Sequence, residues 1–173
     1  MARGTTVTFY RTQDLYLALS RLPREAKAEL RIAAKAIAQV IADDARGRAQ
    51  RLGGVAGLVA PTIRAKSDTV PTIVLGNARK LPLEGSGWKR KSRGGDNQTF
   101  ADIVWGAEFG GARGTRSARR TTQFLPWTGN DESAGYFLYP AVRDNTDFMA
   151  AEYMAAMERA ETTALRVRSA KKR

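Results

Sequence analysis

The sequence predicts an α+β fold: a small antiparallel-rich β-sheet packed by a long N-terminal helix and a C-terminal helix, with long basic loops. An Ala-rich amphipathic pattern runs from Pro23 to about Arg51, and a second amphipathic pattern follows Tyr139 and Pro140. Between them, short β-prone runs alternate with loops rich in Gly, Lys and Arg. With 173 residues, 43% of them hydrophobic, the chain can bury a core. We expect one domain over residues 1–165 and a basic tail over residues 166–173.

The first half of the chain carries the clearest helical pattern. Residues 12–14 predict the N-cap of a short helix that precedes the long one. The long helix should be about 43 Å long, at about 1.5 Å per residue, so we expect part of it to project toward a neighbour. Gly53 and Gly54 should end it, with residues 53–57 as cap and linker. Its expected core stripe is Ala26, Leu30, Ala33, Ile37, Val40, Ile41 and Ala45.

Three β-prone runs follow the long helix. Residues 62–66 and 71–75 are separated by Ser67-Asp68-Thr69 and predict a hairpin. Residues 100–105 end at Gly106 and predict a third strand or a short buried turn. The sheet should therefore form from the middle of the chain.

The closing helix should begin fully only near Asn145, because Asn, Thr and Asp are weak helix formers that favour N-terminal caps. We interpret its Met and Tyr stripe as core packing. From Arg166 onward the tail is too charged to fold alone. The expected apolar face is Val142, Met149, Tyr153, Ala156, Met157 and Ala160.

The net charge of +12 is unevenly distributed. Residues 79–120 contain ten cations and four acids, and residues 166–173 contain five cations and no acid, whereas residues 121–165 contain two cations and seven acids. This separation suits contacts between subunits as well as polyanion binding. Two Gly- and Arg-rich loops, over residues 81–96 and 110–120, should either be solvated and flexible or contact nucleic acid or an acidic neighbouring subunit. Trp88 beside three cations favours contact with nucleic acid or with an adjacent subunit.

The chain contains no His and no Cys, which excludes Ser-His-Asp and Cys-His mechanisms. Asp43 and Asp44 are adjacent on a helix, point in different directions and should be solvated surface. A carboxylate-dependent nuclease would depend on Asp96, Asp102 and Glu108, whose spacing carries no motif; Glu108 is expected to pair structurally with a backbone amide or an arginine. We therefore expect that the chain is not an enzyme and that it binds no cofactor and no metal ion.

The chain also lacks an apolar run long enough to cross a bilayer and an apolar signal core after its first residues. We therefore expect a soluble, unprocessed protein without a membrane partner. The lack of Cys suits a reducing cytoplasm.

Three segments, in this order, carry a resemblance to a known family. The segment Leu19-Ser20-Arg21-Leu22-Pro23-Arg24-Glu25 opens the long helix, Trp105-Gly106-Ala107-Glu108-Phe109-Gly110 ends the central hydrophobic run, and Phe137-Leu138-Tyr139-Pro140-Ala141-Val142-Arg143 opens the closing helix. Together they resemble the tail-completion (head-to-tail joining, neck or tail-terminator-like) proteins of long-tailed bacteriophages. The positions that match the family pattern are Glu108, Phe109, Gly110, Leu138, Pro140 and Ala141, with Trp105 opening the central segment.

The resemblance implies an α+β subunit that forms a hexameric ring at the top of the tail tube. Such a ring completes the tail and joins it to the head connector, while the genome passes through the lumen. Weak, non-specific contacts with the genomic DNA would suit this passage. The implied partners are further copies of the chain, the tail tube protein and the head connector or stopper protein. The implied location is the virion, after synthesis in the bacterial cytoplasm. The terminator and tail-completion rings are not separated by these residues.

The sequence departs from the family pattern in the insertion over residues 81–98 and in the long Arg-rich stretch between Gly110 and Phe137. We expect the cations there to face the lumen or to clamp the acidic helix of the adjacent subunit. A stand-alone basic nucleic-acid-binding protein is the alternative, based on the basic loops and tail. The candidate contact residues are Lys89, Arg90, Lys91, Arg93, Arg113, Arg116, Arg119 and Arg120.

Overall fold

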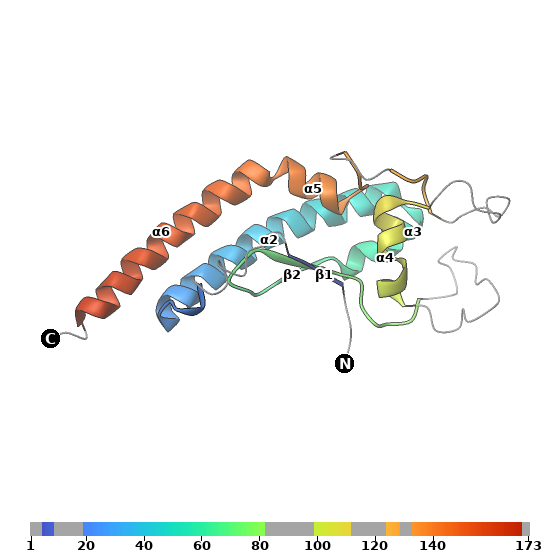
Figure 1. Cartoon of the computed structure of the whole chain (residues 1–173). Coiled ribbons are helices and arrows are strands. Elements are labelled where there is room, and N and C mark those ends of the chain that lie inside the picture. Colours follow the sequence, from blue (N-terminus) through green and yellow to red (C-terminus); the bar gives the residue numbers. More distant parts are fainter. Residues whose placement is uncertain (1–4, 9–18, 82–98, 112–123, 129–132, 171–173) are drawn as a thin grey trace.

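The structure, a computed structural model, describes residues 5–8, 19–81, 99–111, 124–128 and 133–170 and has an α+β fold (Figure 1). The expected α+β class, small antiparallel sheet and long N-terminal helix are confirmed at this level. Most of the two predicted basic loops falls in residues 82–98 and 112–123, outside the described residues. The elements are β1 (Thr5–Thr8), α2 (Arg24–Leu52), α3 (Gly54–Val59), the 3-10 turn η1 (Ala60–Thr62), β2 (Arg64–Lys66), β3 (Thr72–Leu75), α4 (Phe100–Phe109), α5 (Leu138–Asp144) and α6 (Thr146–Ala170).

Helix α2 agrees with the predicted long helix within one residue at each end. Pro23 caps it in an extended conformation, and its carbonyl accepts the Lys27 N–H at 3.0 Å. Gly53 ends it with a φ of 66°, the left-handed region that glycine tolerates. The segment that follows is the short helix α3, so the expected linker over residues 53–57 is wrong in part.

Buried side chains follow α2 from Ala26 to Ala49, so the helix is packed over its whole length and the expected projection is wrong. Two members of the predicted core stripe also lie elsewhere, since Ala33 is half-buried and Val40 is 46% exposed. At 3.6 residues per turn, Ala34 and Ala38 take the core positions instead. The small side chains of this face let α6 approach closely.

The sheet has three strands in the order β1-β3-β2, and both pairs are antiparallel. The predicted hairpin is confirmed by the pairing of β2 with β3, in which Arg64 lies opposite Val74. Strand β3 lies in the centre and is buried throughout. The third strand is β1, which the sequence pattern did not predict.

Residues 100–105 form the first part of helix α4, so the prediction of a third strand or a short buried turn is wrong. The Thr99 hydroxyl and the Thr99 backbone N–H both donate to the Asp102 carboxylate at 2.8 Å, within a capping box at the start of the helix. Such a box satisfies backbone donors that a helix start would otherwise leave unpaired. Local capping therefore outweighs the β-propensity of Ile103 and Val104 here.

Helix α2 lies between α6 and the sheet (Figure 1). Tyr153 of α6 reaches past it and donates its hydroxyl to the Thr69 carbonyl at 2.7 Å, beside the hairpin. The expected core residues Met149, Tyr153, Ala156 and Ala160 are buried on α6, whereas Val142 and Met157 are only partly buried. The three layers thus share one core.

A break at Asn145 separates α5 from α6, as expected for the start of the closing helix. The Asn145 side chain donates to the Ala141 carbonyl at 2.8 Å, and its backbone carbonyl accepts the Met149 N–H at 2.9 Å. At the other end α6 continues to Ala170. The tail expected from Arg166 therefore begins as helix, because five residues continue a helix that is already formed.

Gly76 ties the end of β3 to α4 and gives a prediction for stability. Its φ is 68°, its N–H donates to the buried Thr62 hydroxyl at 3.0 Å, and a Cβ there would lie 2.9 Å from the Ala101 Cα. Gly76→Ala should lower the free energy of unfolding by about 2–4 kcal/mol, measured in urea.

Gly53→Ala is the matched control for this substitution. Its φ of 66° is close to the 68° of Gly76, but a Cβ there would meet nothing within 4 Å. The loss should be about 1 kcal/mol, from backbone strain alone. Equal losses at the two positions would contradict the close contact between Gly76 and α4.

Candidate functional site

All eight cations predicted to contact DNA or a neighbouring subunit lie outside the described residues. Lys89, Arg90, Lys91 and Arg93 fall in residues 82–98, and the four arginines of the second cluster fall in residues 112–123. The motif residues, by contrast, are described. They gather where the end of α4 meets the start of α5, a region we call the α4–α5 junction.

Glu108 is the centre of the α4–α5 junction. Its side chain is almost fully buried, at 1% exposure. One carboxylate oxygen accepts the backbone N–H groups of Phe137 at 3.3 Å and Leu138 at 2.9 Å, and the other accepts that of Tyr139 at 2.9 Å. These are N–H groups at the start of α5, which have no partner within the helix. The expected pairing of Glu108 with backbone amides is confirmed.

Burial raises the pKa of Glu108 above its ordinary value. The three backbone donors and the positive charge of Arg143 act in the opposite direction, because they stabilise the carboxylate, but the loss of water around the group has the larger effect. Arg143 is held nearby by hydrogen bonds from its guanidinium to the carbonyls of Ala134 and Ser133, at 2.8 and 3.2 Å. The junction therefore contains a buried acid surrounded by oriented donors.

Main-chain bonds hold three segments around this acid. The backbone N–H of Tyr136 donates to the Glu108 carbonyl at 2.9 Å, that of Thr128 to the Phe109 carbonyl at 3.0 Å, and that of Gly111 to the Leu125 carbonyl at 2.9 Å. The junction is thus closed by backbone as well as by the carboxylate.

Gly110 and Gly135 allow the segments to approach closely. Gly110 has a φ of 82°, and a Cβ there would collide with the carbonyls of Leu125 and Pro126. Gly135 has a φ of 95°, and a Cβ there would collide with the Glu108 carboxylate. Only glycine fits these two positions without a shift of the backbone.

Four aromatic side chains form a surface over the junction, which we call the aromatic patch: Trp105, Phe109, Trp127 and Tyr139. Phe109 is its centre, stacked on Trp105 with 5.8 Å between ring centroids, tilted against Trp127 at 6.2 Å and edge-on to Tyr139 at 5.1 Å. Trp105 and Trp127 are 43% and 47% exposed. A cluster of exposed aromatic rings is typical of surfaces that contact another molecule.

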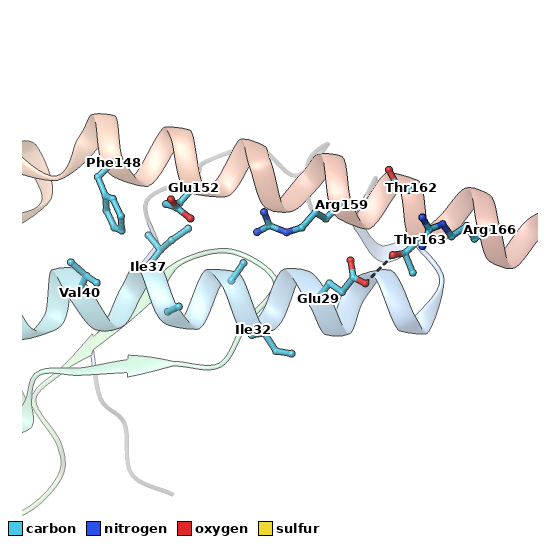
Figure 2. A pocket seen from close by; sticks show the side chains of 12 residues that line it. Glu29, Ile32, Ile37, Val40, Phe148, Glu152, Arg159, Thr162, Thr163 and Arg166 are labelled. Carbon is cyan, nitrogen blue, oxygen red and sulfur yellow. Dashed lines mark hydrogen bonds between the residues drawn. The ribbon is translucent and has the colours of Figure 1, made fainter.

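A second apolar surface lies away from the junction, between α2 and α6. It is an open groove of about 650 Å³, which we call the α2–α6 groove, and Figure 2 shows side chains of both helices along it. Ile32 and Val40 of α2 and Phe148 of α6 are exposed there, Ile32 by 73%. Polar side chains follow toward the end of α6, where the Thr163 hydroxyl donates to Glu29 at 2.8 Å.

Leu138 and Ala141 of the motif are buried in the core and anchor α5, while Pro140 lies in its first turn. The structure thus brings together all seven motif residues predicted from the sequence. It adds Trp127 to them, which the sequence pattern did not single out because it lies 18 residues from Phe109. The α2–α6 groove was also missed, since Val40 was assigned to the core.

Of the acidic residues considered for chemistry, Asp96 lies outside the described residues, whereas Asp43, Asp44, Asp102 and Glu108 have structural partners. Asp43 accepts from Gln39 at 3.0 Å and pairs with Arg46, whereas Asp44 accepts from Arg48 and from Asn145. The two carboxylates thus have separate partners, and Asp44 is partly buried rather than fully solvated.

Arg48 also bridges to Asp144 at 2.6 Å, which ties α2 to the end of α5, and the pKa of Arg48 is raised mainly by its bond to Asp44. Among the described residues, no group of three or more acidic side chains is placed to hold a metal ion. Within the same residues, no helix is long and apolar enough to cross a membrane.

Replacing Glu108 tests the role of the carboxylate in the α4–α5 junction. Glu108→Gln keeps one acceptor but turns an NH₂ group toward a backbone N–H donor, so we expect the free energy of unfolding to fall by about 1–3 kcal/mol in urea. Glu108→Ala leaves three buried donors unpaired and should cost more. Glu158→Gln, at an exposed acid of α6, should stay within about 0.5 kcal/mol of the parent.

We also expect the stability difference between the parent and Glu108→Gln to depend on pH. The pKa of Glu108 is raised in the folded protein, so protonation of this group stabilises the fold. This contribution to the free energy of unfolding is fully present below the ordinary pKa of 4.5 and is lost as the pH rises through the pKa of the folded protein. The advantage of the parent over Glu108→Gln should therefore shrink as the pH is raised from about 4 to about 8. If the stability difference between the parent and Glu108→Gln grew over this pH interval, burial would not be the largest influence on the pKa of Glu108.

Comparisons with models of protein families, with curated proteins and with solved structures found no match. No family is therefore shown by similarity. What can be inferred about function rests on the α4–α5 junction, the two apolar surfaces and the distribution of charge.

Proposed function

We propose that this chain is a structural virion protein of the neck of a long-tailed bacteriophage. It forms a ring at the top of the tail tube, completes the tail and joins it to the head connector, and the DNA passes through its lumen. One observation carries the proposal: the buried carboxylate of Glu108 holds the backbone of Phe137, Leu138 and Tyr139, 29 to 31 residues further along the chain.

This contact joins two of the segments that carry the resemblance, residues 105–110 and residues 137–143. The acid that precedes Phe109 and Gly110 needs backbone donors, and the aromatic-Leu-x-Pro-Ala segment provides them at the start of a helix. Gly110 is required by the carbonyls packed against it, and Leu138 and Ala141 by the core. The residues that resemble the neck proteins therefore form one structural unit, and this supports the proposal.

Exposed apolar surfaces support a role in assembly. The aromatic patch and the α2–α6 groove each expose large side chains that have no cover among the described residues. Interfaces between proteins are enriched in Trp, Tyr and Phe, and these residues often dominate the binding energy. A subunit that joins further copies and other neck proteins needs more than one such surface.

The charge distribution supports passage of DNA. A basic chain attracts a polyanion through contacts that do not depend on sequence, and weak, distributed contacts allow it to move. We assign this role, or the clamping of an acidic helix of the adjacent subunit, to the predicted cation clusters at residues 89–93 and 113–120.

A stand-alone nucleic-acid-binding protein remains the second candidate, on the basis of the net charge of +12. It would be a stable monomer whose affinity for DNA falls steeply with salt. The exposed apolar surfaces favour the neck protein, because phosphate binding does not require them.

An amber mutation in the gene tests the proposed function in the phage that encodes it. Without the protein, infected cells should accumulate DNA-filled heads and tails that remain unjoined, counted by negative-stain electron microscopy. Supplying the protein from a plasmid should restore joined particles. Joined, infectious particles in normal number without the protein would reject the proposal.

Charge reversal tests the two basic clusters. Changing Lys89, Arg90, Lys91 and Arg93 to Glu, or Arg113, Arg116, Arg119 and Arg120 to Glu, should lower the yield of joined particles or the release of DNA from them. Particle counts separate the first effect from the second, which appears as lower infectivity per particle. Normal yield and infectivity after both reversals would reject a role for these cations.

A further inference from the structure

The aromatic patch and the α2–α6 groove lie in different parts of the molecule and differ in form. The patch is formed by α4, α5 and the segment around Trp127, whereas the groove lies between the long helices (Figures 1 and 2). The patch presents exposed rings, and the groove is a hollow with an apolar end at Ile32, Val40 and Phe148. Each copy of the chain therefore carries one surface of exposed aromatic rings and one groove with apolar side chains in its lining.

We propose that the aromatic patch of one copy docks into the α2–α6 groove of the next copy. This inference rests on the proposed ring, and it names the surfaces that close it. A contact between two different surfaces of identical chains is repeated from copy to copy and closes into a ring when the rotation permits. Pairing patch with patch would stop at two copies and would leave the groove uncovered.

Size supports this occupant. A groove of about 650 Å³ falls in the range of about 300–1,000 Å³ in which proteins enclose drug-sized molecules, so it has room for the exposed parts of two indole rings. Trp105 and Trp127 are the two most exposed rings of the patch. Tryptophan in a desolvated pocket is among the strongest anchors of protein interfaces.

Charge also favours this contact. Copies that each carry a net charge of +12 repel one another, so they should touch where their surfaces carry no net charge. The four members of the patch are uncharged. The groove is lined by two acids, Glu29 and Glu152, and by two arginines, Arg159 and Arg166, which balance.

Hydrogen-bonding groups are complementary as well. Within the described part of the chain, the indole N–H groups of Trp105 and Trp127 have no hydrogen-bond acceptor. The groove offers the exposed carboxylate of Glu152, one turn beyond Phe148. Indole is a donor and carboxylate an acceptor, so docking pairs groups that are unused in the single chain.

Site-specific cross-linking tests the contact, because the chain has no Cys of its own. Leu125→Cys places a thiol on an exposed residue beside the patch, and Val40→Cys places one in the groove. A mixture of the two variants, distinguished by a size tag, should give a mixed dimer with a short bismaleimide. The chain that carries both substitutions should give a ladder of higher multimers.

Met154→Cys is the matched control, since Met154 is exposed on α6 but does not line the groove. It should give no mixed dimer with Leu125→Cys. Adding Trp127→Ala to Leu125→Cys should lower the yield of the mixed dimer with Val40→Cys by about tenfold, provided that thermal unfolding shows the variant to be folded. A similar yield with Met154→Cys as with Val40→Cys would overturn the proposal.

The remaining outcomes also decide the matter. Dimers formed only between two Leu125→Cys chains would show patch-to-patch pairing and overturn the proposal. The same reaction in purified particles separates this inference from the proposed function: particles that are normally joined but give no link between Leu125→Cys and Val40→Cys reject the interface and leave the neck role intact. Unjoined heads and tails in the amber mutant bear only on the neck role.

Discussion

The buried carboxylate of Glu108 is the interaction on which the arrangement of this molecule depends. It satisfies three backbone donors at the start of α5 and so fixes that helix against the end of α4. Burying a charge is costly unless it is well paired, and here the pairing is with oriented backbone dipoles and a nearby arginine. The position of α5 in turn sets where α6 begins, and α6 covers α2.

The hydrogen bonds between Glu108 and the start of α5 also position the aromatic patch. Phe109 follows Glu108 directly in the chain. The backbone of Tyr139 is fixed because its N–H donates to the Glu108 carboxylate. The rings of Phe109 and Tyr139 therefore meet edge-on at 5.1 Å, and Trp105 stacks from one helical turn earlier. The buried hydrogen bonds of Glu108 therefore determine the positions of the exposed rings of the aromatic patch.

Much of the fold could be predicted from local patterns. The 3.6-residue period located α2 within one residue, glycine ended it, and the hairpin of β2 and β3 followed from turn residues between β-prone runs. The structural role of Glu108 was also predicted, because it is an acid within an apolar segment. The predictions of α2 and the hairpin succeeded because short-range interactions decide those elements, whereas the backbone partners of Glu108 lie 29 to 31 residues further along the chain.

Tertiary structure decided the rest. The apolar content of residues 100–105 suited a strand as well as a helix, and the capping box at Thr99 together with packing against Gly76 favoured the helix. Strand β1 pairs with β3, whose residues lie 64 or more positions further along the chain. The sequence alone determined which segments are helical, apolar or charged, because those properties are local. Which faces remain uncovered, and therefore where Trp127 and Val40 lie, was decided by contacts between distant segments.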